Sequence, residues 1–369
     1  MKKIKIDKTY IVVILCLFAL CIIGCVMVYS ASSYSSQKYY NNSLHFLIKQ
    51  IVGVLIGTCG FIFFMFFDYK KLKKFKWLMV IVSVILLLLV FIPGIGISNY
   101  GARRWIGLFG LSFQPSEIAK FSLVLFCACH FSKHKDDAKS FKTLLPVISV
   151  GGLFCLLVII EPNMSITMCL GIVMLCMMFF GGVRLKYFAL IAIPALLLVP
   201  MLIIIEPYRL LRLMAFLDPW ASPQGEGFQL IQSLYSLGNG GLFGVGLFSS
   251  RQKYLYLPFA ESDFIFSIIC EELGFFGASF VILIFAVLIV CLVKIALNSK
   301  DRFASLLVAG IACVICAQVI INIAVVTGSM PPTGLPLPFI SAGSTSLMVF
   351  MSAIGICLNV HRQNYKNFQ

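Results

Sequence analysis

The chain has 369 residues, of which 60% are hydrophobic and 12% are charged, and its mean hydropathy is +1.01. A soluble domain carries about 25% charged residues, so this composition excludes both an ordinary soluble protein and a disordered chain. The net charge of +15 does not indicate nucleic-acid binding, because the cations are scattered in short loops instead of forming one basic face. We therefore expect a polytopic integral membrane protein with an all-α fold and no nucleic-acid partner.

About ten apolar blocks are long enough to cross a hydrocarbon core of about 30 Å. The first block is too long for the apolar core of a cleavable signal peptide, so we expect it to remain as a membrane anchor. Together the blocks predict a single membrane domain over residues 1–369. The blocks lie at residues 10–30, 45–67, 77–95, 115–131, 143–160, 164–182, 187–205, 264–293, 303–327 and 339–360.

The distribution of charge predicts the orientation of the spans. With the N-terminus in the cytoplasm, the cytoplasmic segments hold 20 of the 29 Lys and Arg residues, as the positive-inside rule requires. Both termini are then cytoplasmic, and most acidic residues lie at the outer ends of spans. Ionisable groups there are costly and are candidates for function, so we expect chemistry at the outer face. The large extracytoplasmic loop, at about 206–262, should form short interfacial helices that cap a cavity.

Two patterns that could suggest a ligand are better explained by packing. The 14 cysteines lie in or at the ends of apolar segments, and the CxxC pair Cys313 and Cys316 lacks a second ligand pair, so neither disulfides nor a metal site is predicted. The glycine-rich stretch 238–246 lacks the residues of a nucleotide-binding loop, so close helix packing or a flexible gate is favoured.

Asp263 directly precedes the block 264–293. As a helix this block is about 45 Å long, so its first two to three turns should stand above the hydrocarbon core, or the helix should tilt. Either Ser262 or Asp263 caps this helix, or Asp263 is a catalytic carboxylate; the two interpretations are compatible, and the residues leave both open. Glu271 and Glu272 follow, and we expect a structural role, with one of them paired to an arginine of the outer loop.

Polar residues also mark the outer end of the block 115–131. Glu117 and Lys120 share one helix face, where they form a structural ion pair or the lysine binds a phosphate. Arg103 and Arg104 stand beside Trp105, which is also compatible with simple anchoring at the interface. The proline-rich segment 328–339 cannot be helical, so it should pack against protein as a wall of the same cavity.

Taken together, these segments resemble the SEDS family (shape, elongation, division and sporulation) of FtsW, RodA and SpoVE, and they lean towards the FtsW/SpoVE branch. The resemblance extends over nearly the whole chain. The motifs that carry it are Gln114-Pro115-Ser116-Glu117, Tyr208-Arg209, Arg212, Phe216-Leu217-Asp218-Pro219-Trp220, Gly227-Phe228-Gln229, Asp263-Phe264-Ile265-Phe266, Glu271-Glu272-Leu273-Gly274 and Thr333-Gly334-Leu335-Pro336-Leu337-Pro338-Phe339.

The resemblance implies the SEDS fold and a peptidoglycan glycosyltransferase of the plasma membrane. Such an enzyme polymerises lipid II into β-1,4 glycan strands at the outer face for cell division or sporulation, and undecaprenyl pyrophosphate leaves. A class B penicillin-binding protein would supply the transpeptidase, alongside other divisome or sporulation membrane proteins. Asp263 corresponds to the family's essential aspartate, which would act as general base on the 4-hydroxyl of the acceptor GlcNAc for attack on C1 of the donor MurNAc.

The resemblance also assigns the substrate site. Arg104, Lys120, Arg209 and Arg212 correspond to basic positions that would bind the substrate and its pyrophosphate, and Glu117 corresponds to a further functional position. No residue is identified as a metal ligand. A divalent cation, Mg²⁺ or Mn²⁺, is a candidate for neutralising the pyrophosphate charge.

The chain departs from the family pattern at several positions, and two other functions stay open. The departures are Asn163, Phe259, Glu261, Ala342 and Ser344, and none alters Asp263. A lipid II flippase would also suit an outward cavity, although it needs ionisable groups through the membrane depth and the inner half carries no carboxylate. A non-catalytic scaffold of a division or sporulation complex would leave Asp263 dispensable.

Overall fold

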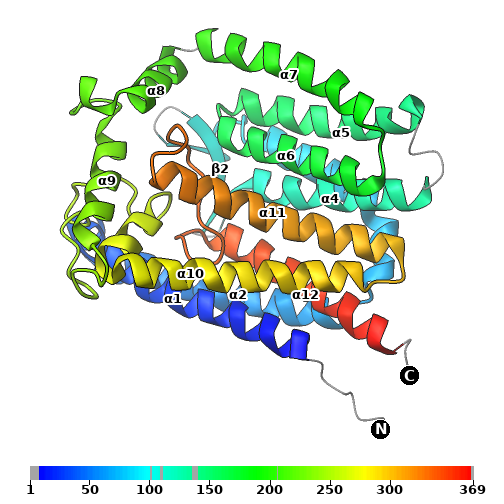
Figure 1. Cartoon of the computed structure of the whole chain (residues 1–369), viewed down its shortest axis with the longest axis horizontal. Helices are drawn as coiled ribbons and strands as arrows, with labels where there is room; N and C mark the ends of the chain where they lie inside the picture. Colours follow the sequence, from blue (N-terminus) through cyan, green and yellow to red (C-terminus); the bar gives the residue numbers. More distant parts are fainter. Residues whose placement is uncertain (1–7, 100–101, 109–110, 135–139, 206, 367–369) are drawn as a thin grey trace.

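The computed structural model describes residues 8–99, 102–108, 111–134, 140–205 and 207–366. Within these residues each predicted apolar block forms a helix, and consecutive helices alternate in direction across the bundle (Figure 1). The helices are α1 (Lys8–Tyr40), α2 (His45–Phe66), α3 (Lys76–Leu89), α4 (Pro115–Lys133), α5 (Phe141–Ile160), α6 (Met164–Gly181), α7 (Leu185–Ile205), α10 (Ile265–Leu297), α11 (Arg302–Val326) and α12 (Ser344–Lys366).

Seven helices of the described chain are long and apolar enough to cross a membrane: α1, α2, α5, α6, α10, α11 and α12. Of the other three, α3 has only 14 residues and α4 carries Glu117, Lys120 and Lys133. These helices make the chain a multi-pass membrane protein. The prediction of an all-α membrane fold is confirmed.

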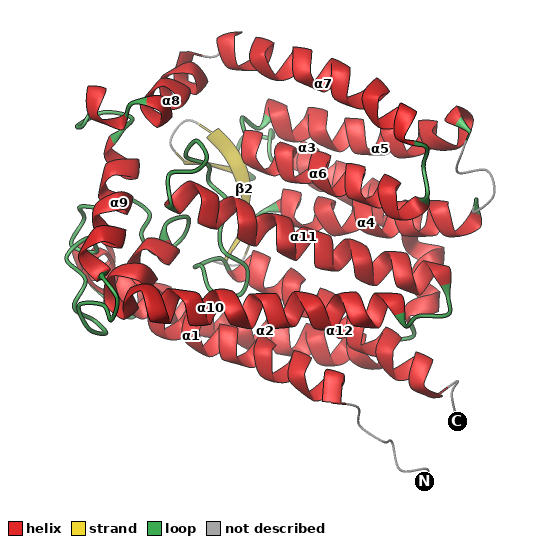
Figure 2. Cartoon of the chain, viewed as in Figure 1, coloured by secondary structure: helices red, strands yellow, loops and turns green. Residues whose placement is uncertain are grey.

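The bundle has two distinct ends, because the helices alternate in direction (Figure 2). One end holds residues 41–44, 90–99, 102–108, 111–114, 161–163 and 327–343, and we call it the site end. The opposite end, the terminal end, holds the start of α1, the end of α12 and the 3₁₀ helix η1 (Tyr69–Phe75).

A small antiparallel sheet at the site end was not expected. It contains β1 (Gly96–Asn99), β2 (Ala102–Leu108) and β3 (Leu111–Phe113) in the order β1-β2-β3, with Gly96 opposite Ile106 and Gly107 opposite Ser112. Strands of three to seven residues show too few alternations of polar and apolar residues to stand out in a sequence.

The large loop also lies at the site end and is built from short helices, as expected. These are α8 (Pro207–Leu217), the 3₁₀ helix η2 (Pro219–Ala221) and α9 (Phe228–Gly240), followed by turns that lead into α10. Figure 1 shows α8 and α9 along one edge of the bundle, beside the ends of the long helices.

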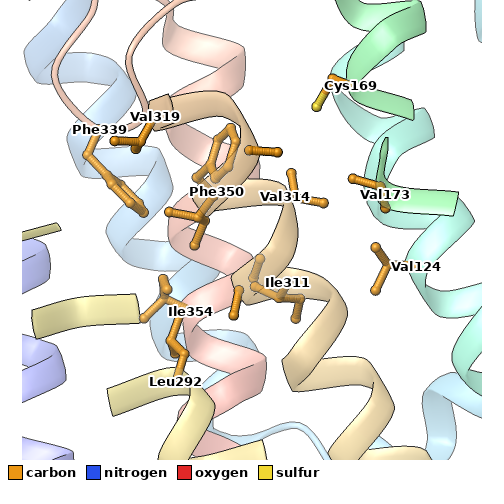
Figure 3. Close-up of a cluster of buried hydrophobic side chains, with 14 of the residues drawn as sticks. Val124, Cys169, Val173, Leu292, Ile311, Val314, Val319, Phe339, Phe350 and Ile354 are labelled. Atoms are coloured by element: carbon orange, nitrogen blue, oxygen red, sulfur yellow. The ribbon is translucent and has the colours of Figure 1, made fainter. Parts of the chain in front are cut away.

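The core is centred on α11, which contacts α4, α6, α10 and α12. In Figure 3, Ile311 and Val314 of α11 lie between Val173 of α6 on one side and Phe350 of α12 on the other. Cys169 lies in the same cluster, which fits the expectation that cysteines act as packing residues. Because lipid is as apolar as these side chains, close van der Waals packing holds such helices together.

The glycine-rich stretch packs against a break in α10. Gly274 has φ +66° inside α10, and a Cβ on Gly244 would lie 2.1 Å from the backbone oxygen of Glu272. A Cβ on Gly240 would lie 2.0 Å from the oxygen of Cys270. The prediction of close packing is therefore confirmed, and the first two and a half turns of α10, about nine residues, form a separate segment before the break.

Candidate functional site

Asp263 lies in the last turn before α10, with its side chain partly exposed at the site end. The N-cap of α10 is Phe264 and no side chain caps the helix, so of the two interpretations left open by the sequence, a cap at Ser262 or Asp263 is excluded. The carboxylate of Asp263 is therefore not occupied by capping and remains available for chemistry.

The proline-rich segment forms one wall around Asp263, as predicted. Asn322 of α11 donates its side-chain amide to the backbone oxygens of Asp263 (2.8 Å) and Leu335 (2.7 Å), which ties the two segments together. Ser341 donates to the oxygen of Ser262 at 2.6 Å. A Cβ on Gly334 would lie 3.1 Å from Oδ2 of Asp263, so this glycine lets the backbone approach the carboxylate closely.

Two of the predicted arginines influence this carboxylate. Arg104 projects from β2 and donates to the backbone oxygens of Glu161 (Nε, 3.2 Å) and Pro162. Arg212 projects from α8, donates to the oxygen of Pro332 at 3.2 Å and lies 3.8 Å from the carboxylate of Glu226. The sheet, α8 and the proline-rich segment are thus held around one site.

The surroundings of Asp263 tune its acidity. Burial, together with the nearby carboxylate of Glu261, raises its pKa to about 6, and the guanidinium groups of Arg212 and Arg104 act in the opposite direction. Burial also raises the pKa of Glu261. A carboxylate with a pKa near 6 is still ionised at neutral pH, and it is a stronger base than an ordinary aspartate.

Glu161 is a site residue that the sequence analysis did not single out. It lies in the loop between α5 and α6, fully buried, and neither carboxylate oxygen has a hydrogen-bond partner. Burial raises its pKa to about 8, although Arg104 lowers it. The sequence signal that could have identified Glu161 is a carboxylate in the three-residue connection between two apolar spans. Its neighbour Asn163 caps α6 by accepting from the N–H of Ile166, as an aspartate could also do.

Glu117 and Lys120 form a buried ion pair in the first turns of α4. The pair is 2.9 Å apart, and both residues are fully buried. Lys120 also donates to Gln318 of α11 at 2.5 Å, and Gln318 in turn donates to the oxygen of Pro336 at 2.8 Å. The pair therefore supports the proline-rich segment through Gln318. Direct binding of substrate by these two residues stays a prediction.

Glu271 and Glu272 are structural, as expected, but the ionic partner differs from the prediction. Glu272 pairs with buried Lys253 at 3.1 Å rather than with an arginine, and it accepts from Ser30 at 2.6 Å. Glu271 accepts from the backbone N–H of Arg251 at 3.2 Å. These contacts fasten the loop that precedes Asp263 onto α10.

The role of Arg209 and a bound divalent cation stay predictions. Arg209 belongs to α8, but its side chain lies outside the described residues. Within the described part of the chain, no three His, Cys, Asp or Glu side chains gather as metal ligands, so the donor set does not make a metal site held by the protein alone.

The fold and the site together define a multi-pass membrane protein that gathers a carboxylate with raised pKa and two arginines at one end of its bundle. The family described as "Cell cycle protein", FtsW/RodA/SpoVE, matches residues 10–366. The chain belongs to this family.

Individual relatives agree with this assignment. The chain is 38% identical over 362 residues to "Stage V sporulation protein E" of Bacillus subtilis (strain 168), covering 98% of each chain. It is 39% identical over 360 residues to "Probable peptidoglycan glycosyltransferase FtsW" of Trichlorobacter lovleyi, covering 97% of this chain and 94% of the relative.

Solved structures share the fold. A chain from a study of a peptidoglycan synthase complex that coordinates polymerization and crosslinking matches with a TM-score of 0.79 and 27% identity, over 96% of this chain and 98% of that one. The rod shape determining protein RodA of Thermus thermophilus matches with a TM-score of 0.71 and 24% identity, over 96% of each chain, which supports the fold alone.

Proposed function

We propose that this chain is a peptidoglycan glycosyltransferase that polymerises lipid II into β-1,4 glycan strands. The observation that carries the proposal is the partly exposed carboxylate of Asp263, whose pKa of about 6 is set by burial, Glu261 and two arginines. A base with a pKa just below the working pH is ionised and can still accept a proton from a hydroxyl in the transition state. The names of the relatives support the same activity.

In the proposed reaction Asp263 is the general base. Its carboxylate takes the proton of the acceptor GlcNAc 4-hydroxyl while that oxygen attacks C1 of the donor MurNAc. The bond between C1 and the pyrophosphate oxygen breaks, and its electron pair leaves with undecaprenyl pyrophosphate. Arg104 and Arg212 stabilise the negative charge that develops on the leaving group, since fixed cations are most effective where charge appears.

The other predicted residues have supporting roles in this proposal. A role of Arg209 as a further cation for the pyrophosphate stays a prediction. Glu117 and Lys120 act indirectly. They support the proline-rich segment through Gln318, which donates to the oxygen of Pro336. A Mg²⁺ or Mn²⁺ ion on the pyrophosphate stays a prediction. The described residues do not gather the ligands of a metal site held by the protein alone.

We propose that the site end faces outward from the plasma membrane. The excess of Lys and Arg at the terminal end supports this orientation. A class B penicillin-binding protein is the proposed transpeptidase partner, and the matched chain from a peptidoglycan synthase complex supports an assembly of this kind. One relative is named for sporulation and another is named FtsW, so the same chemistry could serve cell division or sporulation. Other divisome or sporulation membrane proteins stay predicted partners.

Polymerisation in detergent micelles distinguishes the enzyme from a flippase. Purified protein with its transpeptidase partner is mixed with lipid II, and glycan strands are resolved by gel electrophoresis. We expect strands, because micelles contain no second leaflet and a flippase would leave lipid II unchanged. Absence of strands, together with movement of lipid II across a vesicle bilayer, would assign the chain to transport. Absence of both activities would favour the scaffold.

A further inference from the structure

The terminal end carries a second concave site, far from Asp263 along the bundle. A cavity of about 350 Å³ lies between η1, the start of α3, the end of α4 and the start of α11. Among the described residues its lining contains four cations, one acid and two uncharged residues of α4. The lining residues are Lys73, Lys76, Cys129, Ser132, Lys133, Asp301 and Arg302.

The acid among the described lining residues is already engaged by the protein. Asp301 caps α11 by accepting from the N–H of Phe303 at 3.1 Å, and it accepts from the hydroxyl of Tyr69 at 3.3 Å. It also lies 3.6 Å from Lys73. Because one carboxylate with these duties cannot neutralise four cations, the cavity keeps an excess of positive charge.

The other cations are positioned to meet an anion. Among the described residues no carboxylate lies within ion-pair distance of Lys76 or Lys133, and both side chains are at least partly exposed. Arg302 donates through Nη2 to the oxygen of Gly181 at 2.8 Å, while its buried Nε has no hydrogen-bond partner. Arg302 therefore has donor capacity that the described residues do not use.

Lysines at the ends of spans ordinarily point into water and need no ligand. This group differs, because cations from four separate elements converge on one hollow. The outer side of α3 is also apolar next to the cavity, where Trp77, Leu78 and Ile81 are 51%, 52% and 53% exposed. Tryptophan is typical of the level of the lipid headgroups, so an acyl chain can follow α3 while its headgroup lies beside Lys76.

We propose that this cavity binds the phosphate group of an anionic phospholipid from the leaflet at the terminal end. Basic pockets between spans recognise phosphate headgroups in this way, with each cation near the surface adding to the attraction. Lys73, Lys76, Lys133 and Arg302 bind the phosphate oxygens. The apolar side of α3 selects a lipid over free phosphate. This site is independent of the polymerisation chemistry.

Native mass spectrometry of the full-length protein tests the proposal, with phosphatidylglycerol, phosphatidylcholine and inorganic phosphate offered in separate titrations. The test variant is Lys76→Gln/Lys133→Gln, and the matched control is Lys71→Gln/Lys74→Gln, which removes the same charge from η1 outside the cavity. We expect phosphatidylglycerol to bind the wild type at least tenfold more tightly than phosphatidylcholine. The test variant should lose most of this preference, while the control keeps it within about twofold.

Equal loss in both variants, or no preference in the wild type, would overturn the proposal. Binding of inorganic phosphate that competes with phosphatidylglycerol at similar concentration would overturn the choice of a lipid. If the test variant folds poorly, the wild-type protein can instead be crosslinked to a photoactivatable phosphatidylglycerol. Crosslinks should concentrate on the peptides around Lys76 and Lys133, and crosslinks spread evenly over the terminal end would contradict the site.

Discussion

Asp263 combines two properties that oppose each other in most aspartates. It is buried enough to be a stronger base, and it is exposed enough to reach a substrate. Arg212 and Arg104 moderate the effect of burial, so that the carboxylate stays ionised at neutral pH. Gly334 leaves room for the carboxylate, since a side chain there would press on Oδ2.

The pH dependence of polymerisation follows from this balance. The carboxylate must be ionised to act as base, so kcat/KM should fall about tenfold per pH unit below a midpoint near 6. Arg212→Gln removes an effect that lowers the pKa, so the midpoint should move to higher pH. Steady-state rates of glycan formation between pH 4.5 and 8 provide the measurement. A midpoint below 5, or one that Arg212→Gln leaves in place, would refute this account of Asp263.

Glu161 should make the stability of the protein depend on pH. Its folded pKa of about 8 lies above the ordinary value of 4.5, so the folded chain holds a proton that the unfolded chain releases. Its contribution to stability is complete below about pH 4.5 and is lost as the pH rises through 8, at about 1.4 kcal/mol per unit. Glu161→Gln cannot ionise, so the Tm in detergent should fall less between pH 6 and pH 9 than in wild type. An identical fall in both proteins would contradict the assignment.

At the scale of elements, the break in α10 and the glycine loop form one interlocked unit. Gly244 has φ +80°, a conformation that side chains rarely adopt, and lies directly against the backbone of Glu272. The carboxylates of Glu271 and Glu272 hold the same loop from α10.

Two glycine substitutions, one inside this unit and one outside it, test the packing of the unit. Gly244→Ala should lower stability by more than about 1 kcal/mol, through both backbone strain and a collision with the oxygen of Glu272. Gly238→Ala in α9 meets no atom within 4 Å and should be neutral or stabilising by up to about 1 kcal/mol. Thermal melting in detergent compares the two. Equal effects would mean that the loop does not pack as described.

The ion pair of α4 provides a second test at this scale. Lys120→Met leaves Glu117 buried without its cation and should destabilise the chain by about 3–5 kcal/mol. The double variant Lys120→Met/Glu117→Gln should recover most of that stability, as melting curves would show. If the pair only supports the proline-rich segment, the double variant should keep measurable polymerisation. A stable double variant with no activity would instead mean that Lys120 binds the pyrophosphate directly.

For the whole molecule, the sequence predicted the arrangement of helices well because long apolar blocks leave few alternatives in a membrane. It also placed the proline-rich segment against the site, since its backbone needs protein partners. It missed the strands around Arg104, which are too short to show a period. It left a cap at Ser262 or Asp263 open, because a single sequence does not show that α10 has its N-cap at Phe264. The pairing of Lys253 with Glu272 depends on packing that a single sequence does not display.

The most direct measurement is polymerisation of purified lipid II by Asp263→Asn, with Asp218→Asn as the matched control. Asp218 is an exposed carboxylate at the same end that caps η2, and asparagine caps equally well, so the control should retain wild-type activity. Asp263→Asn keeps the size of the side chain and removes the base. It should lower the rate by 10²–10⁴-fold, the usual contribution of a general base, with a melting temperature no lower than that of the wild type. Glycan formation by Asp263→Asn at the wild-type rate would contradict the central claim.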